Sequence, residues 1–315
     1  MKNKAKYFLV LFSFVLCAFC FLSNSSTAPQ SKEELGKLLF FDPILSQDKS
    51  ISCSSCHKPE FAFADTVAFS DGVGGNLTSR NVPSVMNVTD RSSFFWDGRA
   101  NTLQEQVIFP IENEHEMNLP MNEALSRLNS SEEYISYFKK LYAESPSKDN
   151  VCDAIAAFEK TLETSNTPFD RYAKGDENAI SEKAKRGQQV FNDKGCFDCH
   201  FSPDFTGDEF KNIGLYNGNK LNDVGRFKIT GRYDDIGKFK VPGLRNVAVT
   251  APYMHNGMFR TLRQVIEYYA QPEQVVKVRN NTDSLVENGL QLNEQEIQEL
   301  EAFLKTLTDD RFAKK

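Results

Sequence analysis

Apolar residues recur at intervals of three and four along several stretches of the chain, and no stretch alternates apolar and polar positions for long. The segment 31–34, Ser-Lys-Glu-Glu, is typical of a capping box and predicts a short helix that runs through Leu39. Helical spacing of apolar side chains predicts amphipathic helices elsewhere. The stretches with this spacing are 121–141, 150–163, 181–191, 261–269 and 293–307. The pattern therefore predicts a mainly α-helical chain.

The regions between these helices indicate two similar units. The segments 65–90 and 201–246 are rich in Gly, Asn, Asp and Pro, which predicts long, ordered loops. Loops of this length need something to pack on, and a large apolar cofactor in each unit would supply it. The helical pattern breaks at 165–177. We therefore expect an N-terminal domain at 29–165 and a C-terminal domain at 178–312.

The first residues have the layout of a secretory signal peptide. Lys2, Lys4 and Lys6 precede an apolar run at 7–22, and small polar residues follow it. A retained membrane anchor is the alternative, but the run is somewhat short for a membrane span. We therefore expect residues 1–26 to be a cleaved signal peptide and the mature protein to be periplasmic.

Charge and composition narrow the possible partners. The formal net charge is −6, with 25% charged and 40% hydrophobic residues, as in an ordinary soluble protein. Binding to nucleic acid needs clustered Lys and Arg, and the chain has no basic run outside its first residues. Nucleic acid is therefore not an expected partner.

The most informative residues are the cysteines and histidines, of which the chain has seven and four. Two Cys-x-x-Cys-His motifs are present, formed by Cys53, Cys56 and His57 and by Cys196, Cys199 and His200. This motif attaches c-type haem: two thiols reach the haem vinyl groups, and the His coordinates the iron. A zinc site would need two further Cys or His ligands per motif, and too few remain. A thioredoxin-like redox pair would not require the His in both copies. The motifs predict two covalently bound haem c groups, and Cys152 is expected to be a buried core thiol.

Further short segments carry a family resemblance. They are Leu-Leu-Phe-Phe-Asp-Pro at 38–43, Arg-Asn-Val-Pro at 80–83, Phe-Trp-Asp-Gly-Arg-Ala at 95–100, Thr-Pro-Phe-Asp-Arg-Tyr at 167–172, Val-Pro-Gly-Leu-Arg-Asn at 241–246 and Thr-Ala-Pro-Tyr-Met-His-Asn-Gly at 250–257. With these segments, residues 35–312 resemble the bacterial dihaem cytochrome c peroxidases and their relative MauG. The resemblance implies two cytochrome c-like domains, each with one haem. It also implies that the N-terminal haem reacts with peroxide and the C-terminal haem transfers electrons.

The resemblance also implies roles for individual side chains. Trp96 matches the tryptophan between the two haems, although a lone Trp is ordinarily a core residue. Gln106, Pro110 and Glu116 match the peroxide side of the N-terminal haem. Cleavage of an O–O bond needs a base that takes a proton from peroxide and returns it to the leaving hydroxide, and a Glu in a confined apolar pocket suits this task. A surface acid is the alternative for Glu116, since Glu112 and Glu114 lie beside it.

A calcium site between the haems is implied in the same way. Asn81 matches a side-chain ligand, and Thr250 and Pro252 match positions whose backbone carbonyls bind the ion. Hard oxygen ligands suit calcium. The alternative at Thr-Ala-Pro is a plain turn.

Two departures from the ordinary peroxidases separate this chain. The loop at 69–79 contains no His, although family peroxidases carry one there that closes the peroxide haem until the other haem is reduced. We therefore expect an N-terminal haem that is open to peroxide without reductive activation. Tyr269 occupies the position of the usual axial Met of the C-terminal haem, as in MauG, so the resemblance implies a Tyr ligand there. Met254 and Met258 are competing ligands. A second alternative is that Tyr269 is an ordinary aromatic residue on the face of a helix. His255 is expected to be structural.

Three functions are consistent with these residues. The first is a periplasmic peroxidase that reduces hydrogen peroxide to water with electrons from a small redox protein, either a cytochrome c or a cupredoxin. The second is a MauG-like enzyme that stores two oxidising equivalents across both haems and oxidises Trp or Tyr residues of a partner protein. The third is a dihaem electron carrier, which would leave Gln106 and Glu116 without a purpose. The protein is expected to be a monomer or a homodimer.

Overall fold

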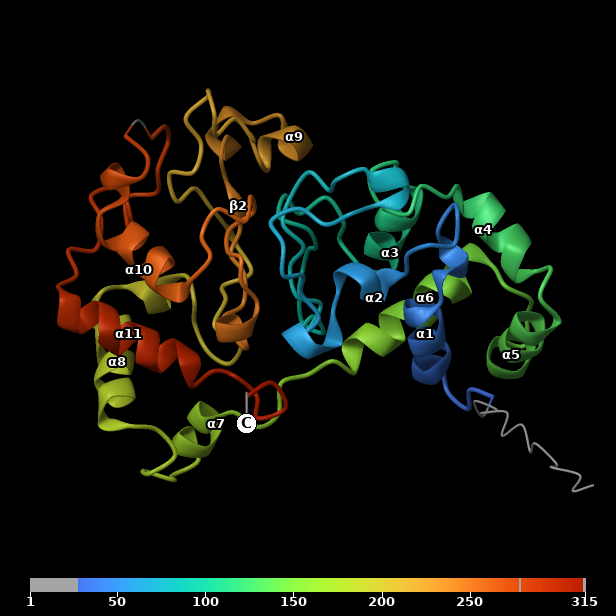
Figure 1. Cartoon of the computed structure of the whole chain (residues 1–315), viewed down its shortest axis with the longest axis horizontal. Helices are drawn as coiled ribbons and strands as arrows, with labels where there is room; N and C mark the ends of the chain where they lie inside the picture. Colours follow the sequence, from blue (N-terminus) through green and yellow to red (C-terminus); the bar gives the residue numbers. More distant parts are fainter. Residues whose placement is uncertain (1–27, 278, 314–315) are drawn as a thin grey trace, which may run out of the picture.

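The computed structural model describes residues 28–277 and 279–313, so the expected signal peptide at 1–26 lies outside the described residues. The chain forms two helical halves joined by the segment before α7 (Figure 1). The N-terminal half contains α1 (Lys32–Phe41), α2 (Cys53–Cys56), α3 (Leu103–Glu112), α4 (Met121–Leu128), α5 (Glu132–Tyr142) and α6 (Lys148–Lys160). The C-terminal half contains α7 (Pro168–Ala173), α8 (Glu182–Asp193), β1 (Phe210–Lys211), α9 (Phe227–Thr230), β2 (Phe239–Lys240), α10 (Leu262–Ala270) and α11 (Glu294–Lys305). The expected mainly α-helical class is confirmed, and β1 pairs antiparallel with β2 in the one small sheet of the described residues.

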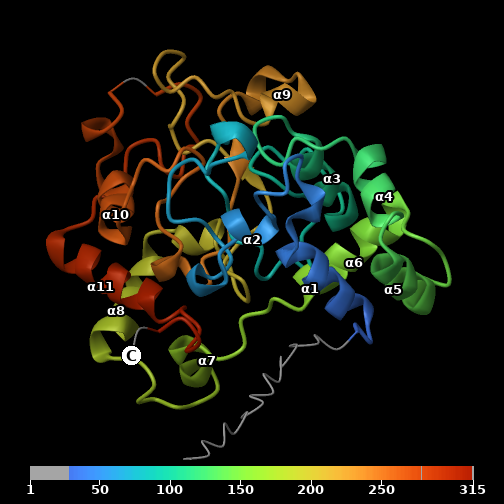
Figure 2. The same cartoon turned by 45° about the vertical axis from the view of Figure 1, so that its right-hand side comes forward.

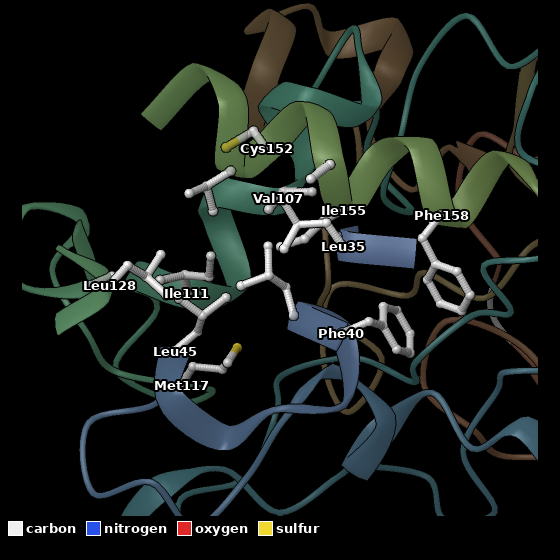
Figure 3. Close-up of a cluster of buried hydrophobic side chains, with 14 of the residues drawn as sticks. Leu35, Phe40, Leu45, Val107, Ile111, Met117, Leu128, Cys152, Ile155 and Phe158 are labelled. Atoms are coloured by element: carbon white, nitrogen blue, oxygen red, sulfur yellow. The ribbon is translucent and has the colours of Figure 1, made fainter. Parts of the chain in front are cut away.

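The core of the N-terminal half lies where α1 and α3 pack on α6 (Figure 3). Leu35 and Phe40 from α1 and Ile155 from α6 are fully buried there. Cys152 lies on α6 and is also buried, as expected from its position in the helical pattern. A second, separate core in the C-terminal half is built in the same way, from α8, α10 and α11.

One glycine in each half lets the two main helices cross closely. A Cβ atom on Gly36 of α1 would overlap the carbonyl oxygen of Ala154 on α6. A Cβ atom on Gly187 of α8 would overlap the carbonyl oxygen of Glu299 on α11 in the same manner. Only glycine permits backbones to approach this closely. The two halves are thus copies of one helix-crossing arrangement.

Three sequence-based expectations about helices need correction. The stretch 121–141 is two helices, because the chain turns after α4 at Asn129 and restarts at the N-cap Ser131. Helix α3 was not expected, since Pro110 lies inside it and obscures the helical pattern. At the start of α1, Ser31 accepts a hydrogen bond from the Glu34 N–H, but the Glu34 carboxylate accepts from Gln30 and so does not complete the capping box.

Asn246 fastens the two halves together. Its side chain is fully buried, donates to Thr164 Oγ1 at 2.8 Å and accepts from the Asp309 N–H at 2.9 Å. The segment after α11 therefore returns to the junction, where Phe312 packs against the N-terminal core. The long loops of the two halves face each other across the middle of the molecule (Figures 1 and 2). No helix in the described part of the chain is long and apolar enough to cross a membrane.

Candidate functional site

The first Cys-x-x-Cys-His motif occupies the single turn of α2. At the start of this turn, the Ser52 N–H donates to Ser55 Oγ at 3.0 Å, and His57 ends the turn. His57 Nδ1 lies 3.0 Å from the carbonyl oxygen of Phe63, and since a carbonyl can only accept, Nδ1 donates and Nε2 keeps its lone pair. Burial lowers the pKa of His57, against the opposing pull of nearby carbonyls, so the imidazole is neutral. A neutral, fixed imidazole is the form that binds iron.

The second motif repeats this arrangement around η4 (Cys196–Asp198). His200 Nδ1 lies 3.0 Å from the carbonyl oxygen of Phe205, and burial lowers the pKa of His200 as well. Burial raises the pKa of Cys53 and of Cys196 to about 12, so both thiols are protonated, and all four motif cysteines are free and half-buried. Half-buried thiols beside a fixed imidazole and aromatic walls fit a covalently attached haem in each half.

The walls of the two sites are matched aromatic clusters. In the N-terminal half, Phe40 packs edge-on against Phe63 and Phe158, with ring centroids 6.1 and 5.1 Å apart. In the C-terminal half, the corresponding rings are Phe191, Phe205 and Phe303. In both clusters the residue whose carbonyl holds the His is itself one of the rings. In each half, one Phe therefore contributes its ring to the wall and its backbone carbonyl to the orientation of the His.

Helix α3 brings two of the expected peroxide-side residues onto one face. Gln106 and Pro110 are half-buried and four residues apart, so they lie one turn above each other. Pro110 has no N–H to offer the Gln106 carbonyl. Its own carbonyl accepts from the Met117 N–H at 3.0 Å, which ties the segment that carries Glu116 back to the helix.

Glu116 is held in place by that segment and by the loop at 69–79. Asn113 Nδ2 donates to Glu116 Oε1 at 2.7 Å, and the Val73 N–H donates to the Glu116 carbonyl at 2.8 Å. A Cβ atom on Gly72 would overlap the backbone of His115, so the loop approaches closely here. Burial raises the pKa of Glu116, against the opposing effects of Asn113 and Arg99. The carboxyl group thus binds a proton more readily than an exposed glutamate does, which suits a group that takes up and returns a proton.

His115 points away from this site. Its side chain is 53% exposed, and Nε2 lies 3.7 Å from the carboxylate of Glu114. Glu114 itself is 81% exposed. The two neighbours of Glu116 are therefore surface residues, and Glu116 alone of the three is turned inward.

Trp96 lies where the two halves meet. Its Nε1 donates to the Asn81 carbonyl at 2.8 Å, and its own carbonyl accepts from the Lys240 N–H at 2.8 Å. The indole stands edge-on to the ring of His255, with centroids 6.4 Å apart. His255 in turn stacks on Phe239 at 3.7 Å. An aromatic contact thus connects the N-terminal half with the C-terminal half at this residue.

A largely buried ion-pair network is centred on Asp97, the residue that follows Trp96. Arg80 is bidentate to Asp223 of the other half, at 2.6 and 2.9 Å, and donates to Asp97 at 2.6 Å. Burial would raise the pKa of Asp223, but the hydrogen bonds and charge of Arg80 lower it to about 2. Asp97 also accepts from Arg99 at 3.0 Å. Asp97 therefore connects Arg80 and Asp223, where the two halves meet, to Arg99. Arg99 is the residue that opposes the rise in the pKa of Glu116.

The structure separates the two adjacent tyrosines of α10. Tyr268 is fully buried and donates to the Ile213 carbonyl at 2.6 Å, so its hydroxyl group is already used. The Tyr269 hydroxyl has no hydrogen bond within the described residues, and the thiols of Cys196 and Cys199 act on its pKa, which burial raises. Tyr269 therefore faces the second motif, whereas Met254 packs in a different cluster with Tyr268.

The three residues expected to bind calcium have unused oxygen atoms. Asn81 Nδ2 donates to the carbonyls of Val67 and Ala68, at 3.1 and 3.4 Å, which leaves Oδ1 without a donor in the described part of the chain. The carbonyls of Thr250 and Pro252 accept no hydrogen bond there either. Hard, unpaired oxygens fit calcium chemically. The calcium site stays a prediction.

Sequence reasoning missed Asn113, Arg99 and Gly72. Each had a local signal: Asn113 precedes Glu116 by one turn, Arg99 lies inside the Trp96 segment, and Gly72 lies in the loop that lacks a His. None of these signals points to Glu116 by itself. Their common role follows from contacts between segments that are far apart along the chain.

Two family models match the chain, one mainly in each half. Residues 30–178 match the family model for di-haem cytochrome c peroxidase, and residues 184–308 match that for cytochrome c. The methylamine utilization protein MauG of Methylophilus methylotrophus is 39% identical over 79% of this chain and 74% of its own length. Cytochrome c551 peroxidase of Nitrosomonas europaea is 36% identical over 88% of this chain and 80% of its own length.

A solved structure is similar throughout. The crystal structure of a MauG-like protein associated with microbial copper homeostasis superposes with a TM-score of 0.81 and 30% identity, covering 90% of this chain and 93% of the other. The expected pair of cytochrome c-like domains is thereby confirmed. The chain belongs to the family of di-haem cytochrome c peroxidases and MauG proteins, which are haem-dependent oxidoreductases.

Proposed function

We propose that this protein is a periplasmic peroxidase that reduces hydrogen peroxide to water with two electrons from a small redox protein, a cytochrome c or a cupredoxin. Cys53, Cys56 and His57 would hold the N-terminal haem, which would supply the chemistry with peroxide. Cys196, Cys199 and His200 would hold the C-terminal haem, which would supply electron transfer, and Trp96 would relay electrons between the two halves. We also propose that calcium binds at Asn81, Thr250 and Pro252.

The inward-turned carboxyl group of Glu116 carries this proposal. It is held by Asn113, its pKa is raised by burial, and its segment is bonded to the loop at 69–79. That loop carries no side chain that binds haem iron well. A protein that only carries electrons would need neither the inward-turned Glu116 nor a peroxide-accessible haem beside the loop at 69–79.

The chemistry divides between the haem and the chain. When bound to His57, the haem supplies the redox chemistry that cleaves the O–O bond. Glu116 takes the proton of the attacking oxygen of peroxide and returns it to the leaving hydroxide. Gln106 lines the same face of α3 and positions peroxide, while Pro110 leaves that face without a ligand atom.

The test is to mix the fully ferric protein with hydrogen peroxide and record spectra within milliseconds. An immediate spectral change supports an open N-terminal site, because no prior reduction is needed. A requirement for prior half-reduction would contradict it. Steady turnover with reduced cytochrome c or a reduced cupredoxin then tests the electron source.

A second candidate function is the oxidation of Trp or Tyr residues on a partner protein, as proposed for a MauG-like enzyme. Tyr269 favours it, because a phenolate ligand stabilises ferric and higher oxidation states of the C-terminal haem. Under this alternative, peroxide is consumed without a reduced donor, and an added protein substrate gains oxidised aromatic residues detectable by mass spectrometry. Donor-dependent turnover without such products supports the peroxidase.

A further inference from the structure

The crossing helices of the two halves can be matched residue by residue. Gly36 contacts the backbone of Ala154 on α6, as Gly187 contacts that of Glu299 on α11. Four residues further on, Phe158 and Phe303 occupy corresponding places in the two aromatic walls. The next residue is Leu304 in the C-terminal half, where it belongs to the core. In the N-terminal half, that place is occupied by Glu159.

Glu159 is a buried acid without a partner among the residues that the structure describes. Its side chain is only 4% exposed, its Oε2 makes no hydrogen bond, and it forms no ion pair with any residue in 28–277 or 279–313. Burial is the cause that raises its pKa, to about 8. An unpaired buried carboxyl destabilises a fold, so a leucine, as in the other half, would be the simpler choice.

The surroundings of Glu159 place it on the wall of the N-terminal haem site. The preceding residue, Phe158, packs on Phe40 and Phe63, and Phe63 holds His57. The charge of Glu159 also acts on the Cys53 thiol.

Few charged groups share this environment. Cys53 of α2 feels the charge of Glu159, and Cys56 and Glu116 are the other titratable groups that act on the same thiol. No charged side chain of α1 or α3 contributes to the pKa of Glu159. The thiols of Cys53 and Cys56 would cease to titrate once bonded to haem, and a bound haem would bring its own charge to this site.

We propose that Glu159 binds and releases the proton that accompanies a change in the redox state of the N-terminal haem. When a one-electron donor, either the small redox protein or an electrode mediator, reduces the ferric haem, the site would lose one positive charge and the carboxylate would take up one proton from solvent. When peroxide or the oxidised mediator removes the electron, that proton would be released. The inference rests on haem attachment at Cys53 and Cys56, and it does not depend on peroxidase activity.

The sign of the effect follows from the charge. A ferric haem attracts the carboxylate form of Glu159, so its pKa is lower in the oxidised than in the reduced protein. Between these two pKa values, the midpoint potential falls by about 59 mV for each tenfold fall in proton concentration. Outside that interval, the potential does not depend on the ionisation of Glu159.

The experiment is a spectroelectrochemical titration of both haems between about pH 5 and about pH 9.5, a range that brackets the raised pKa of a buried acid. We expect the sloped interval for the N-terminal haem of the unmodified protein. Glu159→Gln and Glu159→Leu should both remove the slope. The leucine variant reproduces the residue found at the matching place of the C-terminal half, and it serves as the test if the glutamine variant fails to fold. The C-terminal haem, with Leu304 at the matching place, is an internal control without this slope.

Glu163→Gln is the matched control variant, because Glu163 is an exposed acid four residues further along the same segment. It should keep the slope. A slope that persists in both Glu159 variants, or that is absent from the unmodified protein, would overturn the proposal. A haem assay on each variant shows whether two haems are still attached, so loss of haem or of peroxidase activity is not mistaken for loss of proton coupling.

Discussion

The two halves of the molecule share a scaffold and differ at the positions that face the haem. Helix α3 of the N-terminal half corresponds to helix α10 of the C-terminal half, and each begins at an N-cap Thr, Thr102 and Thr261. Each cap follows a bridged loop with a positive φ, at Phe95 in one half and at Met254 in the other. The halves are therefore comparable position by position.

Counting from the two caps, the eighth residue is Pro110 in α3 and Tyr269 in α10. One half thus has no ligand atom where the other has a phenol. At the matched wall position, the first half has Glu159 and the second has Leu304. One backbone arrangement thus carries different side chains at matched positions of the two halves, and the proposed division of chemistry between the haems depends on these few differences.

The largest expected effect concerns the acid found only in the first half. Glu116→Gln should slow the reaction of the ferric protein with peroxide by about 10²- to 10⁴-fold, because a general base is lost. Stopped-flow spectra measure the rate, and the haem content should not change. Glu114→Gln, at the exposed neighbour, is the control and should react at the normal rate. Equal rates in both variants would remove Glu116 from the mechanism.

The shared helix crossing is tested by Gly36→Ala and Gly187→Ala. Alanine within a helix ordinarily stabilises it by about 1 kcal/mol relative to glycine. Here the new Cβ would overlap a backbone carbonyl, so we expect each variant to lower the free energy of unfolding by about 3 kcal/mol. Denaturant titration measures this loss. Lys37→Ala, at an exposed position of α1, should have little effect, and unchanged stability in either glycine variant would show that the halves are not built alike.

The adjacent tyrosines of α10 test whether the C-terminal haem has a phenol ligand that the N-terminal haem lacks. Tyr269→Phe should change the ferric spectrum of the C-terminal haem and leave that of the N-terminal haem unaltered. Tyr268→Phe loses the hydrogen bond to Ile213, so it should cost about 1 kcal/mol of stability without a spectral change. If the spectral change follows Tyr268 instead, or neither residue, the assignment of the ligand is wrong.

The smallest effect is expected from Arg99. Burial raises the pKa of Glu116 and Arg99 opposes this rise, so Arg99→Gln should raise that pKa further. A base acts in its ionised form, and the rate with peroxide therefore increases as the pH rises through the pKa of Glu116. Relative to the unmodified protein, the variant's rate profile should shift to higher pH by about one unit or less. Arg99→Lys keeps the charge and should shift it less, whereas a shift to lower pH would contradict this role.

Local sequence patterns predicted a large part of the molecule. The two motifs, the helices of the crossings and the buried thiol of Cys152 follow from periodicity and spacing that lie within a few residues of each other. Helix α3 was missed because Pro110 breaks the pattern, and only packing on α6 keeps the helix continuous there.

The sequence alone identifies the chemical groups that are available: two haem attachment motifs, an acid at 116, a tryptophan at 96 and a loop without histidine. Packing between distant segments brings these groups together or keeps them apart. Within residues 28–277 and 279–313, it places Glu116 inward beside the loop at 69–79, gives a hydrogen-bond partner to the hydroxyl of Tyr268 but not to that of Tyr269, and leaves Glu159 buried without an ion pair. The physical reason is that burial and pairing depend on segments distant in the chain, and these set the pKa and the free bonding capacity of each group.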